Sequence, residues 1–275
     1  MSRKKRDRKG RDREIRPVLN ELSLKLNLDP LVARIVGLNV IEILSPFTVM
    51  LAFTKTENPG ATDVFNNGTG SLVDIGQRKL LVTNHHVYEE FEKWRSEVPC
   101  TRLVMSGVDG RPFVDISGQP CIDSDESYDL AALAISPSIV EQQGKKFYPA
   151  SAWPPQRPKE GTRVVIVGYP GQGLHAQESD TLGVMPLSVG RTVTSVSDRH
   201  FLMADETQDA YTHAPEGQRL LTSYGGISGS AAYSVHRIRN RSDEYHLCGF
   251  VKAEGFDHTI LVAHADHINA DGTIR

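Results

Sequence analysis

A short run of glycines and serines, Gly225–Ser230, places Ser228 between glycines. A nucleophilic serine needs a hydroxyl that stands clear of other side chains, on a backbone that turns sharply. Glycine adopts the φ and ψ values that such a turn requires, and N–H groups of the turn can point at the oxygen that becomes negative in the transition state. Because ordinary turns share this composition, the run indicates a nucleophile only if a base and a carboxylate accompany it.

Two other stretches supply candidates for the base and the carboxylate. An apolar run ends at Thr83 and is followed three residues later by His86. Further along, Asp129 opens the apolar run Leu130–Ile135. A Ser–His–Asp relay needs an imidazole that takes the serine proton and a carboxylate that fixes the tautomer of the imidazole. His86, Asp129 and Ser228 are therefore the candidate base, carboxylate and nucleophile.

The order His, Asp, Ser and the surrounding motifs resemble the trypsin/chymotrypsin-like serine peptidases, particularly their compact bacterial, cytoplasmic members. Thr83-x-x-His86-Val87 is similar to the histidine motif of that family. Asp129–Leu133 is similar to its aspartate motif, and Gly226–Gly229 to its serine motif. The resemblance covers roughly residues 46–268.

This resemblance implies an all-β fold of two six-stranded-type antiparallel barrels, with the active site in the cleft between them. It implies a serine endopeptidase that needs no cofactor and acts on a protein or peptide substrate. The backbone N–H groups of Gly226 and Ser228 would form the oxyanion hole. Thr222 would lie at the base of the primary substrate pocket, and Ala253 and Glu254 near its entrance. A dedicated regulatory protein partner is a further expectation, suggested by the extra N-terminal segment.

Three residues of the serine motif depart from the family pattern. Ile227, Ser230 and Ala231 stand where relatives commonly have Asp or Asn, Gly and Pro. In secreted relatives, a carboxylate before the serine pairs with the amine of a newly cut N-terminus. Ile227 offers no carboxylate, so we expect a site that needs no such cut. The departures also leave open an alternative, a catalytically weak or inactive peptidase fold that serves in binding.

Neighbouring residues compete for each role. His85 adjoins His86, and the Thr-x-x-His pattern selects His86. Ser230 rivals Ser228, but the Gly-x-Ser-Gly frame fits Ser228. We expect the other acidic residues near Asp129 to be solvated charges in a polar loop: Asp123, Asp125 and Glu126.

Signals for metal or phosphate binding are weak. Histidines occur at positions 258, 264 and 267, but no Cys or His pair shows the close spacing of structural zinc sites. The run Gly168–Gly173 lacks the Lys-Ser/Thr ending of a phosphate-binding loop. We therefore expect no metal site and interpret this run as a turn at a barrel edge.

The pattern of short strands supports two barrels with an N-terminal extension. Val18, Leu19, Leu22 and Leu26 have helical spacing, and Asp29-Pro30 followed by Gly37 predicts a second helix over 31–36. A helix is also predicted over Val87–Trp94. Strand patterns fall into two sets on either side of a proline-rich stretch. The predicted organisation is a basic tail over 1–16, a helical extension over 17–45, barrels over 46–135 and 161–275, and a linker over 136–160.

Charge is unevenly distributed along the 275 residues, although the net charge is only −3. Residues 1–16 hold nine Lys/Arg and three Asp/Glu, which makes this tail strongly basic. The tail is either a solvated disordered segment or a site for nucleic acid or an acidic partner. The three cysteines are far apart, and there is no secretory signal or membrane-spanning run, so we expect no disulfide framework and a cytoplasmic location.

Overall fold

The computed structural model describes most of the chain from Pro30 to the C-terminus. The described residues are 30–56, 64, 66–107, 111–150, 152–170, 174–176, 182–184, 186–204, 211–213, 226–237, 243–254 and 259–275. For residues 30, 174–176, 182–184, 211–213, 253 and 254 only the backbone is described. The predicted basic tail, the predicted helix over 17–28, and Thr222 lie outside the described residues.

The first sheet is antiparallel and curls into a half-barrel, with strand order β5-β4-β1-β2-β3-β7-β6. A short strand, β8, adds to β2 in parallel. Its strands are β1 (Thr48–Thr54), β2 (Asn66–Asp74), β3 (Lys79–Thr83), β4 (Arg102–Met105), β5 (Val114–Asp115), β6 (Cys121–Asp125), β7 (Leu130–Ala134) and β8 (Tyr148–Pro149). Every residue of β1 is buried, because its two faces pack into different apolar clusters.

The second sheet closes on itself. Its order is β13-β17-β16-β15-β9-β12, and the additional pairing of β13 with β12 completes a barrel of six strands. These strands are β9 (Arg163–Gly168), β12 (Leu187–Val196), β13 (His200–Ala204), β15 (Ala231–His236), β16 (Glu244–Glu254) and β17 (Ile260–His264). A strand β14 (Tyr211–His213) pairs with the outer part of β12, and β10 (Leu174–Ala176) forms a separate hairpin with β11 (Leu182–Val184). The predicted all-β class is confirmed.

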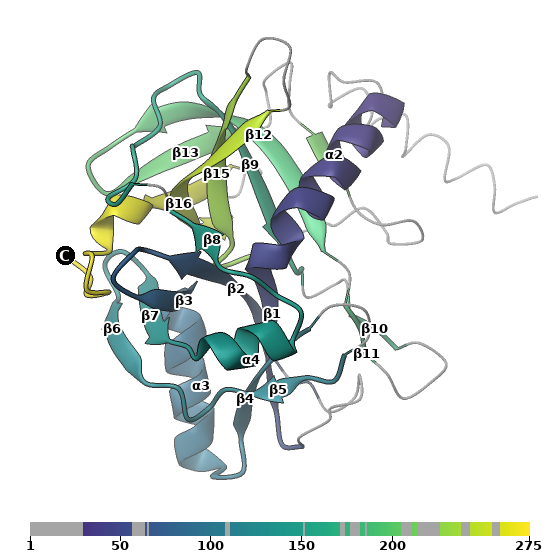
Figure 1. Ribbon diagram of the computed structural model, residues 1–275, viewed down its shortest axis with the longest axis vertical. Helices are drawn as coiled ribbons and strands as arrows, with labels where there is room; N and C mark the ends of the chain where they lie inside the picture. Colours follow the sequence, from purple (N-terminus) through teal and green to yellow (C-terminus); the bar gives the residue numbers. More distant parts are fainter. Residues whose placement is uncertain are drawn as a thin grey trace, which may run out of the picture.

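Helices flank both sheets (Figure 1). In the first half, α3 (His85–Glu97) follows β3, and α4 (Pro137–Gln142) follows β7. The helix α2 (Pro30–Leu44) packs beside the second barrel, against β12 and β14, and leads through the 3₁₀ turn η2 (Ser45–Phe47) into β1. A second 3₁₀ turn, η4 (Ala265–His267), follows β17. No helix among the described residues is long and apolar enough to cross a membrane.

The predicted helix end at Gly37 is wrong. The helix α2 continues through Gly37 to Leu44. Gly37 is buried, and its carbonyl oxygen accepts a 3.1 Å hydrogen bond from the Ser188 hydroxyl of β12. Tertiary packing therefore offsets the roughly 1 kcal/mol that a glycine costs inside a helix. Similarly, α3 is longer at both ends than the predicted Val87–Trp94.

The acidic residues before Asp129 are not all in a loop. Asp123 and Asp125 lie in β6, which pairs with β7 at the edge of the first sheet. An edge strand with both faces partly exposed tolerates polar residues, so its sequence lacks the apolar pattern that would reveal it. The predicted linker over 136–160 also contributes structure to the first half, since it includes α4 and β8.

Candidate active site

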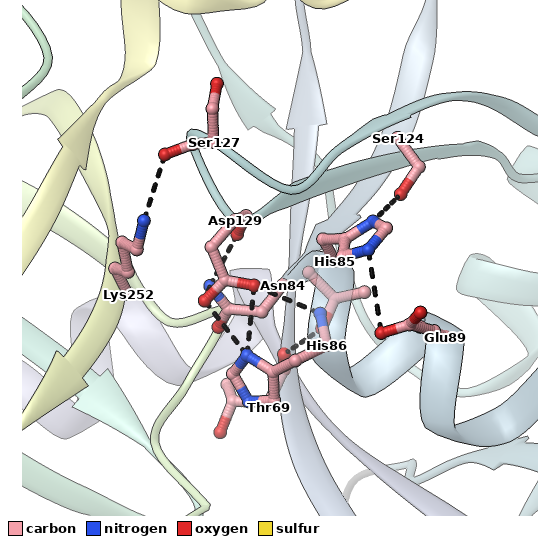
Figure 2. Close-up of polar contacts among 10 residues, drawn as sticks. Thr69, Asn84, His85, His86, Glu89, Ser124, Ser127, Asp129 and Lys252 are labelled. Carbon is pink, nitrogen blue, oxygen red and sulfur yellow. Dashed lines mark hydrogen bonds and ion pairs between the residues drawn. The ribbon is translucent and has the colours of Figure 1, made fainter.

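The histidine of the candidate site is held by the start of α3. The buried strand β3 ends at Thr83, and His86 is the second residue of α3. Its Nδ1 lies 2.9 Å from Oδ2 and 3.0 Å from Oδ1 of Asp129 (Figure 2). Its backbone N–H also donates to Asp129 Oδ1 at 3.0 Å. The carboxylate therefore fixes both the backbone and the ring of this histidine.

The two side chains of this pair differ in exposure in a way that suits proton transfer. The His86 side chain is 53% exposed, whereas that of Asp129 is 11% exposed. A sheltered carboxylate at Nδ1 holds the proton there and leaves Nε2, on the far side of the ring, as the acceptor. The structure therefore brings the predicted base and carboxylate together, and about half of the histidine side chain is exposed.

Asn84 is a residue of this site that the sequence reasoning missed. It is fully buried between β3 and α3. Its Nδ2 donates to the Asp129 carbonyl oxygen at 2.7 Å and to Asp129 Oδ2 at 3.2 Å. An Asn directly before a helix ordinarily serves as its cap, and no sequence signal pointed from Asn84 to the carboxylate.

Ser228 lies in a tight turn before β15. The N–H of Ser230 donates to the carbonyl of Ile227 at 2.9 Å. Gly226 has φ 98° and Gly229 has φ 90°, in the left-handed region where only glycine is unstrained. The two glycines that flank the serine are thus required by the backbone, as the motif predicted.

Hydrogen bonds hold the serine turn of the second barrel against β2 of the first sheet. The N–H of Thr69 donates to the Ser228 carbonyl at 3.0 Å, and its hydroxyl donates to the Gly226 carbonyl at 2.7 Å. The Ser71 hydroxyl donates to the Gly229 carbonyl at 2.9 Å. Thr69 thus anchors the backbone on both sides of the serine.

The close approach at Gly229 places this turn beside the strand that leads to the histidine. A Cβ at Gly229 would collide with the carbonyl oxygen of Thr69 and would lie 2.8 Å from Thr83 Oγ1. Thr83 is the last residue of β3, three positions before His86. The two sheets therefore bring the serine turn and the His86–Asp129 pair to one junction.

The residues that compete with the predicted histidine and serine have other surroundings. His85 Nδ1 lies 2.7 Å from Ser124 Oγ, and its Nε2 lies 3.7 Å from a Glu89 carboxylate oxygen, on the side away from Asp129 (Figure 2). Ser230 is fully buried, whereas Ser228 is partly exposed. The geometry favours His86 over His85 and Ser228 over Ser230.

The nearby acidic residues have structural partners. Asp123 Oδ2 accepts from the N–H of Ile274 at 2.8 Å. Asp125 Oδ1 accepts from the Ser127 hydroxyl at 2.6 Å and the Tyr128 N–H at 2.9 Å. Burial raises the pKa of Asp125, but these hydrogen bonds together outweigh it and hold the pKa below its usual value. Asp125 therefore shapes the loop before Asp129 and stays ionised there.

Two backbone donors of the serine turn have no hydrogen-bond partner among the described residues. Within the described residues, the N–H groups of Gly226 and Ser228 donate to no partner, whereas those of Gly229 and Ser230 do. A serine peptidase needs such unoccupied N–H groups for the developing oxyanion. The oxyanion hole at these two N–H groups stays a prediction.

The predicted substrate residues are only partly described. The backbones of Ala253 and Glu254 pair with Leu261 and Ile260 on β17. Before them on β16, Lys252 extends its Nζ across to the Ser127 carbonyl at 3.0 Å (Figure 2). This bond joins the second barrel to the loop that carries Asp129, and it places an ammonium group at the rim of the site.

The histidines considered for zinc are bonded to the backbone. His264 Nε2 lies 2.9 Å from the Ser197 carbonyl, and His267 Nε2 lies 2.9 Å from the Arg199 carbonyl. Each Nε2 therefore carries its proton, and burial lowers the pKa of both rings. No cluster of three or more potential metal ligands occurs among the described residues. His258 lies outside the described residues.

A cavity of about 550 Å³ lies away from this site, between β15, β16 and the segment before β9. Ser234, His236 and His246 line one side, and Arg157, Pro158 and Lys159 line another. It contains none of the predicted catalytic residues, so it is separate from the candidate site.

An antiparallel closed barrel joined to a curled sheet, with a His–Asp pair and a glycine-bounded serine turn near their junction, is the arrangement of trypsin-like serine peptidases. The chain belongs to this family, since residues 68–237 match the family model of the trypsin-like peptidase domain. No curated protein sequence matches the chain.

Several solved structures are similar to the chain at low identity. The serine protease domain of the Sesbania mosaic virus polyprotein is 16% identical, with a TM-score of 0.42, over 82% of this chain and 92% of that one. Deg5 is 16% identical, with a TM-score of 0.49, over 87% and 92%. A thermostable serine protease, AL20, from an extremophilic microorganism is 13% identical, with a TM-score of 0.45, over 80% and 91%.

Proposed function

We propose that this chain is a serine endopeptidase that uses His86, Asp129 and Ser228. The observation that carries the proposal is the pair of His86 and Asp129, in which both carboxylate oxygens lie within hydrogen-bond distance of Nδ1 and the histidine side chain is about half exposed. The bonds that hold the Ser228 turn against β2 support it.

In the proposed mechanism, Ser228 Oγ attacks the carbonyl carbon of the scissile peptide bond while His86 Nε2 takes its proton. Asp129 stabilises the resulting imidazolium. The oxyanion binds the N–H groups of Gly226 and Ser228, each of which lowers the barrier by about 3 kcal/mol. His86 then gives its proton to the leaving amine, which departs as the acyl-enzyme forms. Water, deprotonated by His86, hydrolyses the ester and regenerates Ser228.

A digest of a peptide library by the purified protein tests this function, with the Ser228→Ala protein as the control. We expect cleavage within peptides, rather than from their ends, by the unchanged protein only. Labelling by a fluorophosphonate separates an enzyme from an inactive binding protein, because only an activated serine reacts. A protein that neither cleaves nor labels would favour the binding alternative.

Activation is expected to need no N-terminal processing. Ile227 is 3% exposed and packs in the apolar core of the second barrel. An unpaired ammonium buried beside it would cost several kcal/mol. We therefore expect full activity while the residues before Phe47 are still attached, and measure it by following activity and N-terminal sequence together.

The contrary result is activity that appears only after a cut upstream of Phe47 and is lost when the new amine is blocked. If no N-terminal cut is needed, control of the enzyme falls to a partner that acts on loops near the site. We propose the polar segments over 172–181 and 205–218 for this role; within them the structure describes only the backbone of 174–176 and 211–213.

Substrate selection is expected to depend weakly on Glu254. Thr222 offers no charge at the predicted pocket base, so strict selection for Arg or Lys through that base is not expected. Glu254 at the entrance favours a basic residue nearby, and Glu254→Gln should reduce any preference for basic residues in the library digest. An unchanged cleavage pattern would identify Glu254 as an ordinary solvated charge.

Nucleic-acid binding through residues 1–16 remains a second proposal, carried by the concentration of positive charge there. Such binding weakens steeply as salt rises, because it releases counterions from the phosphates. Binding to RNA or DNA that is insensitive to salt, or that survives deletion of residues 1–16, would contradict it. A cytoplasmic location also remains a proposal.

A further inference from the structure

We propose that Asn84 is a positioning residue that holds Asp129 in the orientation His86 requires. The proposal rests on the proposed function of the site, but its experiment separates the two. The side chain of Asn84 binds both the backbone and the carboxylate of Asp129, through Nδ2. It contacts no substrate-facing atom of the mechanism, so any effect on the reaction passes through Asp129.

The ordinary role of an Asn at this position does not account for Asn84. It occupies the N-cap of α3, with φ −79° and ψ 150°, yet its side chain makes no capping hydrogen bond. Its carbonyl still accepts the first helical bond, from the Tyr88 N–H at 3.2 Å. The backbone therefore begins the helix, while the side chain turns away from it toward Asp129.

Asp129 has a backbone that needs such support. It is the one non-glycine residue with a positive φ, 56°, in the part of the chain that the structure describes. Residues outside glycine occupy this region at a cost and persist there when neighbours hold them. The N–H of Asp129 donates to the Glu126 carbonyl at 3.2 Å, and its own carbonyl is held by Asn84 at 2.7 Å.

Asn84 also completes the hydrogen bonds of the carboxylate. Oδ1 accepts from the backbone N–H and Nδ1 of His86, and Oδ2 accepts from Nδ1 and from Asn84. Asn84 is thus the second residue that fixes the carboxylate plane. Without it, Oδ2 keeps only the imidazole as a partner among the residues that the structure describes, and the carboxylate can rotate away from the ring.

The oxygen of the Asn84 side-chain amide indicates how the amide is oriented. Asn84 Oδ1 is buried and has no hydrogen-bond partner among the described residues. The opposite orientation would point Oδ1 at the carbonyl and carboxylate oxygens of Asp129, which repel it. The unsatisfied oxygen is destabilising, so the two bonds to Asp129 are retained despite this cost.

The experiment compares Asn84→Ala and Asn84→Asp with a matched control, His85→Ala, at the same strand–helix junction. His85 adjoins Asn84 in sequence but contacts Ser124 and Glu89. We expect Asn84→Ala to lower kcat by about 10- to 100-fold with little change in KM, as loss of an orienting partner does elsewhere. Asn84→Asp should lower it further, because its carboxylate repels that of Asp129. His85→Ala should retain kcat.

A spectroscopic measurement reports on positioning without any turnover. Proton NMR of ¹⁵N-labelled protein should show a low-field resonance for the His86 Nδ1 proton between the ring and Asp129. Asn84→Ala should shift or broaden this resonance, whereas His85→Ala should retain it. In the unchanged protein, the side-chain amide protons of Asn84 should exchange slowly with solvent.

The outcomes separate the two proposals. Unchanged kcat and an unchanged His86 resonance in Asn84→Ala would overturn the positioning role. Rapid exchange of the Asn84 side-chain amide in the unchanged protein would overturn it too, even if the variants fail to fold. A protein that neither cleaves peptides nor reacts with fluorophosphonate, but whose His86 resonance depends on Asn84, would overturn the proposed function and support the positioning role.

Discussion

Replacing Ser228 with Ala is expected to lower kcat by about 10⁶-fold, the cost of removing the nucleophile from another serine peptidase. The alanine removes only the hydroxyl. The bonds from Thr69 to the backbone at Gly226 and Ser228 should persist. We therefore expect an unchanged fold and unchanged substrate binding. The measurement is single-turnover and steady-state cleavage of a peptide found in the library digest, with circular dichroism as the test of folding.

Because nucleophile and base act as one unit, their substitutions should not add. We expect His86→Ala to be about as damaging as Ser228→Ala, and the double variant to be little worse than either. Ser230→Ala is the matched control, since Ser230 is buried in the same turn and its hydroxyl is not exposed. Full activity in His86→Ala, together with loss in His85→Ala, would show that the assigned base is wrong.

Replacing Asp129 with Asn is expected to lower kcat by about 10⁴-fold, a smaller effect than loss of the nucleophile. The amide preserves the shape of the carboxylate but loses its charge. It also meets the Nδ1 proton of His86 and the amide of Asn84 with one acceptor oxygen in place of two. His86 should then favour the tautomer with its proton on Nε2, which cannot accept from Ser228.

This prediction is checked by steady-state kinetics and by the His86 ring nitrogen shifts in NMR. Asp125→Asn is the control, because Asp125 lies four residues earlier and bonds to Ser127 and Tyr128 rather than to the histidine. Equal losses in the two variants would indicate that a carboxylate at position 129 serves only to shape the loop.

The residues that could be predicted from the sequence are those whose role requires one amino-acid type at a fixed position in a motif. Gly226 and Gly229 were recognisable because their left-handed φ values admit glycine most readily. His86 was selected over its neighbour by the Thr-x-x-His frame, and the structure brings it to Asp129. Strong strands such as β3 and β9 were predicted because their buried apolar runs are distinctive.

The residues that the sequence did not reveal act through tertiary contacts. Asn84 reads as an ordinary helix cap until the loop before β7 is folded against it. Thr69 carried no signal either, because its two bonds to the serine turn cross between the sheets. Gly37 was misinterpreted for a related reason, since the contact that keeps it in a helix comes from Ser188, far along the chain.

The bonds between β2 and the serine turn have a consequence for how this protein matures. They join residues 157, 158 and 160 positions apart in the chain, at Thr69–Gly226, Ser71–Gly229 and Ser71–Ala231. Contacts across such long loops form late, because the chain loses the entropy of closure before these bonds repay it. On a ribosome, every strand of the first sheet has been synthesised before Ser228 is added. The nascent chain therefore carries the proposed base and carboxylate well before the proposed nucleophile is added, so the proposed site can assemble only late in synthesis.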